Sequence, residues 1–157
     1  MDLHIHPLTA AAFAPYGRVV DHTALSGRLY SGDLIENRRP QARLDLSFTL
    51  AEGSTLPCDL KLFERHEFSA QAFLPLDVAG YLVTVCPDDG HGRPDEAGAV
   101  AFRASPQQSI VYAPGTWHHP MVALDRPGRF AIVMWTCGDA GDEELVPLAR
   151  PIRVTDA

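Results

Sequence analysis

Two short segments of the chain hold histidine at spacings that suit acid–base or metal chemistry. The first, FERHEFSAQAFLPL, spans residues 63–76. Its Glu64 and His66 are two residues apart, so on a strand both side chains would leave the same face. Gln71 follows after four intervening residues, which is enough for a turn back toward the same place. An imidazole with a carboxylate nearby can carry protons or hold a divalent metal.

The second segment, YAPGTWHHPM, spans residues 112–121 and contains a Pro114-Gly115 turn with His118 three residues beyond the glycine. The two segments resemble the two motifs of cupin barrels. In the first cupin motif, His-x-His and a later Glu are common, and here the same slots hold Glu64, His66 and Gln71. Each segment alone fits a turn with surface charges. Their joint occurrence, about fifty residues apart, predicts that Glu64, His66, Gln71 and His118 converge in one cavity.

The four residues leave the chemistry of this cavity open. Divalent transition metals favour two or three histidines with a carboxylate, and this set offers two histidines, one Glu and one Gln. A metal such as nickel or manganese is one expectation, with Glu64, His66, Gln71 and His118 as ligands. The other is a metal-free site in which the same groups shuttle protons, with His66, His118 and Glu64 catalytic.

Gln71 itself and four neighbours of the cluster are candidates for binding the substrate. Arg65 could pair with a substrate carboxylate, because guanidinium matches that group bidentately. Gln71 could donate to a substrate oxygen. Tyr112, Trp117 and Phe73 could line the pocket, although aromatic side chains at such positions also serve simply as core. His4, His6, His22 and His91 are expected at the surface, and His119 is expected on the opposite face of the strand from His118.

The elements that must position these residues are predicted to be short strands. Residues 43–50 (RLDLSFTL) alternate strictly between apolar and polar, and residues 81–86 and 130–136 are apolar and β-branched. Frequent proline and glycine leave no room for long amphipathic helices. We expect an all-β, cupin-type (double-stranded β-helix or jelly-roll) barrel with little helix. Short helical turns are predicted at residues 11–16 and at Glu143–Leu145, the latter in an acidic tail.

The composition fits one domain over residues 1–157 and limits the class of protein. The net charge of −7 argues against nucleic-acid binding, which needs clustered basic residues. No apolar run approaches the roughly 20 residues of a membrane span, and the first residues do not resemble a secretory signal. Cys58, Cys86 and Cys137 form no CxxC pair, which predicts reduced thiols in a cytoplasmic protein.

Four stretches in order, PLTAAAFAPYGRVV, FERHEFSAQAFLPL, YLVTVCP and AFRASPQQSIVYAPGTWHHPMVAL, resemble the ureidoglycolate lyase family. The resemblance runs from about Leu8 to Val20 and from about Arg43 to Ile132. It implies a cupin barrel, usually a homodimer, in the bacterial cytoplasm. It also implies cleavage of ureidoglycolate to glyoxylate and urea in allantoin (purine) breakdown, with a divalent metal as a cofactor in family members.

Two regions depart from the family pattern. Residues 21–42 are shorter than in the family and lack its usual Ile-Asn-x-Gly and Arg-x-His-Asp-Leu stretches, and residues 134–138 replace its usual sequence after the last long strand. Two other functions therefore stay open besides the lyase. One is a non-catalytic cupin that binds a small acid. The other is a metal-dependent isomerase or decarboxylase built on the same barrel.

Overall fold

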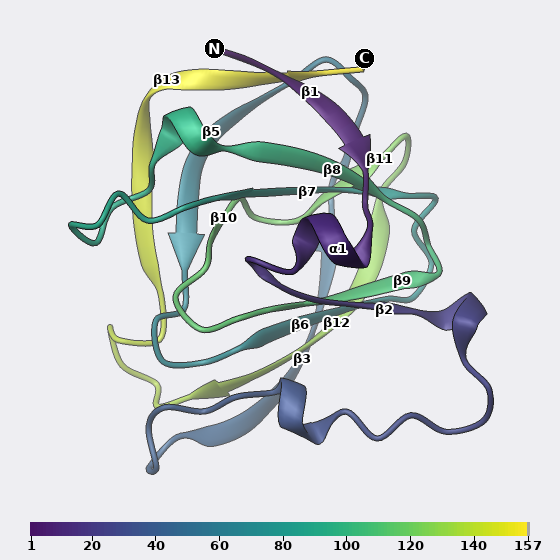
Figure 1. The fold of residues 1–157 in the computed structure, drawn as a ribbon, viewed down its shortest axis with the longest axis vertical. Coiled ribbons are helices and arrows are strands. Elements are labelled where there is room, and N and C mark those ends of the chain that lie inside the picture. The colour runs from purple at the N-terminus through teal and green to yellow at the C-terminus, as the bar shows by residue number, and fades with distance from the viewer. Residues whose placement is uncertain (157) are drawn as a thin grey trace.

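Strands make up most of the computed structural model, which describes residues 1–156 (Figure 1). One sheet has eight strands in the order β10-β5-β13-β1-β8-β7-β11-β4, and β10 also pairs with β7, which closes a ring of six strands. The bounds of these strands are β1 Asp2–Pro7, β4 Gly53–Ser54, β5 Cys58–Arg65, β7 Tyr81–Cys86, β8 Val100–Ala104, β10 Trp117–His118, β11 Val122–Leu124 and β13 Glu144–Thr155.

A second sheet of five strands has the order β2-β9-β6-β12-β3. Its strands are β2 Gly17–Asp21, β3 Arg43–Ala51, β6 Gln71–Pro75, β9 Gln108–Tyr112 and β12 Gly128–Thr136. The helical elements are short: α1 Ala10–Phe13, η1 His22–Ala24, η2 Gly32–Leu34 and η3 Glu96–Gly98. This arrangement confirms the predicted cupin-type barrel with little helix. Among residues 1–156, no helix is both long and apolar enough to cross a membrane.

Strand β7 separates two apolar cores, and all six of its residues are buried. Val83 points to the core between the two sheets, which Phe73, Phe130 and the α1 residue Phe13 complete. Leu82 points the other way, into a core enclosed by the six-stranded ring. Because side chains alternate along a strand, one apolar strand can serve both cores. The continuous apolar run of residues 81–86 is explained by this double burial.

Two helical predictions have different outcomes. The turn expected within residues 11–16 is present as α1, where the Thr9 hydroxyl caps the helix by accepting from the Ala12 amide at 3.2 Å. The short helix expected at Glu143–Leu145 is wrong, since Glu144 already begins β13. Strand β13 pairs with β5 on both sides of a register shift between Pro147 and Ile152. Two prolines in this strand cannot donate to a ladder, and they hid the strand from a sequence pattern.

The alternating strand β3 turns its apolar side chains outward. Leu44, Leu46, Phe48 and Leu50 are 52–70% exposed, while Ser47 and Thr49 on the other face are partly covered. Strand β3 is also an edge strand, paired only with β12. We call the four residues the β3 apolar face.

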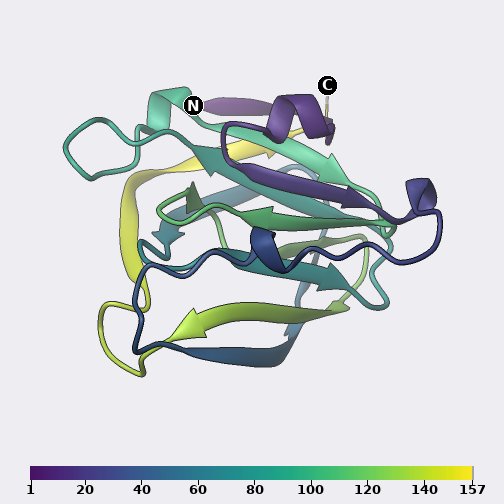
Figure 2. The same ribbon diagram turned by 60° about the horizontal axis from the view of Figure 1, so that its bottom comes forward.

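Residues 21–42 run along the five-stranded sheet from the end of β2 to the start of β3 (Figure 2). Leu34 and Ile35 pack against Ala72 of β6 and Val111 of β9. The indole of Trp135 donates to the Ile35 carbonyl at 2.9 Å. The segment is therefore held to the outer side of the sheet by apolar contact and by hydrogen bonding.

A candidate active site between the two sheets

The four residues predicted to converge lie at one end of the space between the sheets. Strand register places His118 of β10 directly opposite Glu64 of β5. On the facing sheet, Gln71 of β6 lies between Tyr112 of β9 and Met134 of β12. His66 follows the end of β5, and its ring centroid is 5.6 Å from that of His118. Glu64, His66, Gln71 and His118 are all buried.

The Pro114-Gly115 turn connects the two histidine segments. Gly115 has a φ of 82°, in the left-handed region that favours glycine. Its amide donates to the carbonyl of His66 at 2.9 Å. The turn that delivers His118 to the site is thus hydrogen-bonded to the residue that carries the other imidazole.

Both imidazoles are held in the same tautomer by backbone carbonyls. Nδ1 of His66 lies 2.7 Å from the carbonyl oxygen of Asp142, and Nδ1 of His118 lies 2.9 Å from that of Thr116. A carbonyl oxygen can only accept, so both Nδ1 atoms carry the hydrogen. A neutral ring then presents a bare lone pair at Nε2.

The lone pair of His118 faces the carboxylate of Glu64 rather than a donor, and a ring nitrogen of His66 lies within 4.8 Å of both groups. Nε2 of His118 is 3.2 Å from Oε1 of Glu64, and neither Nε2 atom has a hydrogen-bond partner, nor does Oε1 of Gln71. A lone pair that faces a carboxylate is repelled unless a proton or a cation lies between the two atoms. The arrangement is typical of a metal-binding histidine, whose other ring nitrogen donates to a carbonyl.

The donor set fits a divalent transition metal. One ligand atom from each of Glu64, His66 and His118 lies within 4.8 Å of the other two. Two imidazole nitrogens and a carboxylate oxygen suit nickel, manganese, iron or zinc, and the unpartnered Gln71 oxygen adds a neutral donor.

The charges of the site are set by burial and by close neighbours. Burial by itself would raise the pKa of Glu64. A proton held between Nε2 of His118 and the carboxylate, together with positive charge on His118 and His66, outweighs burial and lowers that pKa below its usual value. Burial lowers the pKa of His66, and the nearby His118 lowers it further. Glu64 is therefore an anion at neutral pH, and His66 is a neutral imidazole.

The chain is similar to known proteins over most of its length. The family model described as ureidoglycolate lyase matches residues 1–155. This chain belongs to the ureidoglycolate lyase family. A putative ureidoglycolate lyase of Agrobacterium fabrum is 40% identical to it, over 94% of this chain and 91% of the relative. The ureidoglycolate lyase of Rhodobacter capsulatus is 37% identical over 97% of each chain, and that of Brucella anthropi 36% identical over 83% of this chain and 81% of the relative.

In this ureidoglycolate lyase family chain, the predicted aromatic residues divide between the site and the core. The Tyr112 ring stacks on His118, with centroids 4.0 Å apart and planes 15° apart, and its hydroxyl is buried without a partner. Phe73 packs edge-on against Tyr112 and belongs to the core behind it. Trp117 points away from His118 into the core of the six-stranded ring.

Arg65 is not brought to this cluster. Arg65 is the last residue of β5 and follows Glu64 directly. Strand alternation therefore directs its side chain to the face opposite Glu64. There its guanidinium pairs with Glu144 at 2.8 Å and Asp88 at 3.3 Å and covers the Trp117 ring. The expectation that Arg65 holds a substrate carboxylate therefore stays a prediction, and in this arrangement its guanidinium is already paired with two acidic side chains.

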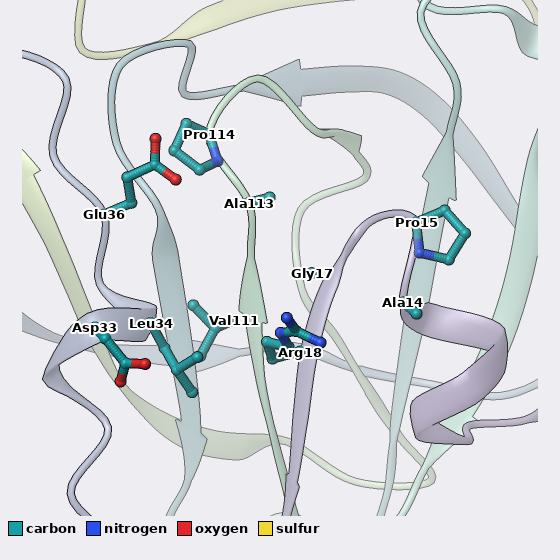
Figure 3. A pocket seen from close by; sticks show the side chains of 10 residues that line it. All are labelled: Ala14, Pro15, Gly17, Arg18, Asp33, Leu34, Glu36, Val111, Ala113 and Pro114. Atoms are coloured by element: carbon teal, nitrogen blue, oxygen red, sulfur yellow. The ribbon is translucent and has the colours of Figure 1, made fainter.

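The surface also has a hollow of about 310 Å³ away from this cluster. It lies beside β2 and β9, and its polar lining includes Arg18, Asp33 and Glu36 (Figure 3). None of the clustered Glu64, His66, Gln71 or His118 side chains lines it. We assign the chemistry to the buried cluster.

The loop between β12 and β13 makes two contributions to the site that the sequence did not predict. The loop supplies the Asp142 carbonyl that holds His66, and it places the Glu143 carboxyl against Glu64. Burial and the Glu64 anion raise the pKa of Glu143. A backbone carbonyl carries no sequence signal, and the acidic run of the tail indicated only a charged segment.

Proposed function

We propose that this protein is a ureidoglycolate lyase, which breaks the C–N bond of ureidoglycolate to release glyoxylate and urea. The family and its similarly sized relatives named ureidoglycolate lyase support this proposal. The observation that carries it is the pair of buried imidazoles with bare Nε2 atoms beside the Glu64 carboxylate. Such a site can take a proton from a small hydroxy acid.

The reacting carbon of ureidoglycolate carries a hydroxyl, a carboxylate and a urea nitrogen. Loss of the hydroxyl proton lets the oxygen form a carbonyl while the C–N bond breaks, and the leaving nitrogen must gain a proton. Neutral His66, with its lone pair held at Nε2, suits the role of base, and the imidazolium that it forms can return the proton to the leaving nitrogen. Glu64 stabilises a positive charge on either ring, and Gln71 can donate its amide to a substrate oxygen. The stacked Tyr112 fixes the plane of His118.

We further propose that Glu64, His66 and His118 hold a divalent metal such as nickel or manganese, with Gln71 as a neutral fourth donor. Held there, the metal would lower the pKa of the substrate hydroxyl. The imidazoles would then serve as ligands and not as proton carriers.

The partner and the cell compartment are part of the same proposal. We propose a homodimer, supported by the β3 apolar face on an edge strand, since large apolar patches on soluble proteins commonly mark interfaces. We propose a cytoplasmic location, supported by three cysteines that form no disulfide in residues 1–156.

The test is glyoxylate release from racemic ureidoglycolate. The purified protein is assayed as isolated, after removal of metals with a chelator, and after reloading with nickel or manganese. We expect release clearly above the spontaneous rate, lost on chelation and restored by metal. Activity that survives complete removal of metal would reject the metal but keep the lyase. No release from any sample would reject the lyase and favour a small-acid-binding cupin or an isomerase or decarboxylase.

A further inference from the structure

Arg39 connects the segment between β2 and β3 to the loop between β12 and β13. Its guanidinium donates to Asp139 at 2.9 Å and also to Asp142. The Arg39 side chain is only 13% exposed, and it lies over the Phe68 ring at 5.3 Å. A guanidinium shared by two carboxylates and stacked on an aromatic ring has one preferred position.

Asp142 connects Arg39 to the active site. Its carboxylate accepts from the backbone amides of Cys137 at 2.8 Å and Gly138 at 2.7 Å, which closes the loop on itself. Its own backbone carbonyl accepts from Nδ1 of His66 at 2.7 Å. One residue is thus held by Arg39 at its side chain and holds His66 at its backbone.

We propose that Arg39 is a positioning residue that keeps His66 in the Nδ1–H tautomer. Without the guanidinium, Asp139 and Asp142 repel each other, and the loop is free to withdraw the Asp142 carbonyl. His66 then loses the acceptor that fixes its hydrogen on Nδ1, and the Nε2–H tautomer becomes populated. In that tautomer the lone pair that faces Glu64 and His118 is gone. This inference rests on the proposed function for its catalytic consequence, but not for the tautomer itself.

Both partners in this contact belong to or adjoin the regions that depart from the family pattern. Arg39 lies in residues 21–42, and its partners Asp139 and Asp142 lie just beyond the altered residues 134–138. The two segments that depart from the family pattern therefore meet through this cluster. Asn37 and Ser69 form a β-bridge next to it, which anchors the segment to the β5–β6 connection.

The test compares Arg39→Met with Arg38→Met. Both substitutions remove one positive charge, but Arg38 pairs with Glu36 at the surface, where its side chain is 50% exposed. The ring nitrogens of His66 are observed by ¹⁵N NMR in metal-free protein, assigned with His66→Gln. The turnover number and KM are measured in parallel. Arg39→Lys is the conservative variant, which keeps the charge but not the fork of donors.

We expect Arg39→Met to populate the Nε2–H tautomer and to lower kcat about 10- to 100-fold, as loss of an outer hydrogen-bond partner typically does. KM should change by less than about threefold, and Arg39→Lys should recover part of kcat. Arg38→Met should match the unmodified protein in both readouts.

A pure Nδ1–H signal in Arg39→Met would overturn the proposal, whatever its kcat. If Arg39→Met does not fold, Asp139→Asn is examined instead, since Asp139 is largely exposed and its loss weakens the same clamp. If the unmodified protein releases no glyoxylate, the proposed function fails. The NMR comparison then still decides whether Arg39 sets the tautomer.

Discussion

At the scale of single residues, the reactive atoms of this site are selected by hydrogen bonds to the backbone. In a neutral imidazole either ring nitrogen can lack the hydrogen. The carbonyls of Asp142 and Thr116 accept from Nδ1 of His66 and His118, so Nε2 is the nitrogen without a hydrogen in both rings. The sequence predicted both imidazoles, along with Glu64 and Gln71, from residue types and turn spacing. It could not predict the tautomers, because both acceptors are main-chain atoms.

Loss of either imidazole should remove most of the activity. We expect His66→Ala and His118→Ala to lower kcat by about 10²–10⁴-fold, the usual contribution of a positioned acid or base, and a similar loss is expected if the imidazoles hold the metal instead. The exposed loop residue His91 provides the control, and His91→Ala should retain full activity. Steady-state glyoxylate release measures all three. Turnover within a factor of two in either cluster variant would contradict the assignment.

Asp142 should make stability depend on pH. Burial alone would raise the pKa of Asp142, but hydrogen bonds from the Cys137 amide and from Arg39 outweigh it and lower that pKa. The stabilisation is therefore full above the ordinary Asp value of 3.8 and disappears as the pH falls through the lowered value in the folded state.

We expect Asp142→Asn to reduce the free energy of unfolding at pH 7 by about 1–3 kcal/mol, because charged hydrogen bonds are lost. The difference from the unmodified protein should shrink toward pH 3. Urea titrations of both proteins at a series of pH values measure it. A difference that is independent of pH would show that the carboxylate charge is not responsible.

At the scale of elements, strands β5 and β10 from one sheet and β6 and β9 from the other place the cluster. Register alone sets His118 opposite Glu64 and Gln71 beside Tyr112. Sequence periodicity predicted the well-patterned strands. It failed for β13, whose prolines and register shift break the pattern, and that strand is recognised only by its pairing with β1 and β5.

The β3 apolar face should be the dimer interface. We expect Leu46→Asp and Phe48→Asp to convert a dimer to monomers, because burying an unpaired carboxylate in an apolar interface costs several kcal/mol. Leu145→Asp is the matched control, since Leu145 of β13 is 52% exposed but lies on the other sheet. Sedimentation velocity measures the outcome. A dimer that persists in both β3 variants would place the interface elsewhere.

At the scale of the whole molecule, one apolar core joins the two sheets that carry the site, and a second fills the six-stranded ring. The core between the sheets lies directly behind the cluster, with Phe73 against Tyr112 and Tyr112 against His118. A ligand that joins Glu64 and His118 to Gln71 therefore links one sheet to the other. Its binding energy should appear as stability of the entire fold.

Metal loading should therefore raise the unfolding temperature. A metal present at 100 times its Kd would add about 2.7 kcal/mol, which corresponds to about 5–10 °C for a chain of this size. Differential scanning calorimetry of chelated and of nickel- or manganese-loaded protein measures the shift. The variant His118→Ala should show little or none of it. An equal shift in His118→Ala would locate the metal outside the cluster.

The sequence by itself determined the residue types at the site, the turns that deliver them and the alternation of the main strands, because these depend on local geometry. Only the tertiary structure decided which lone pairs are free, which of the neighbouring side chains reach them, and which face of β3 is exposed. Arg65 shows the reason clearly. Its chemistry suits a carboxylate ligand, but its position on β5 commits it to Glu144 and Asp88, and that competition is visible only when distant segments are placed together.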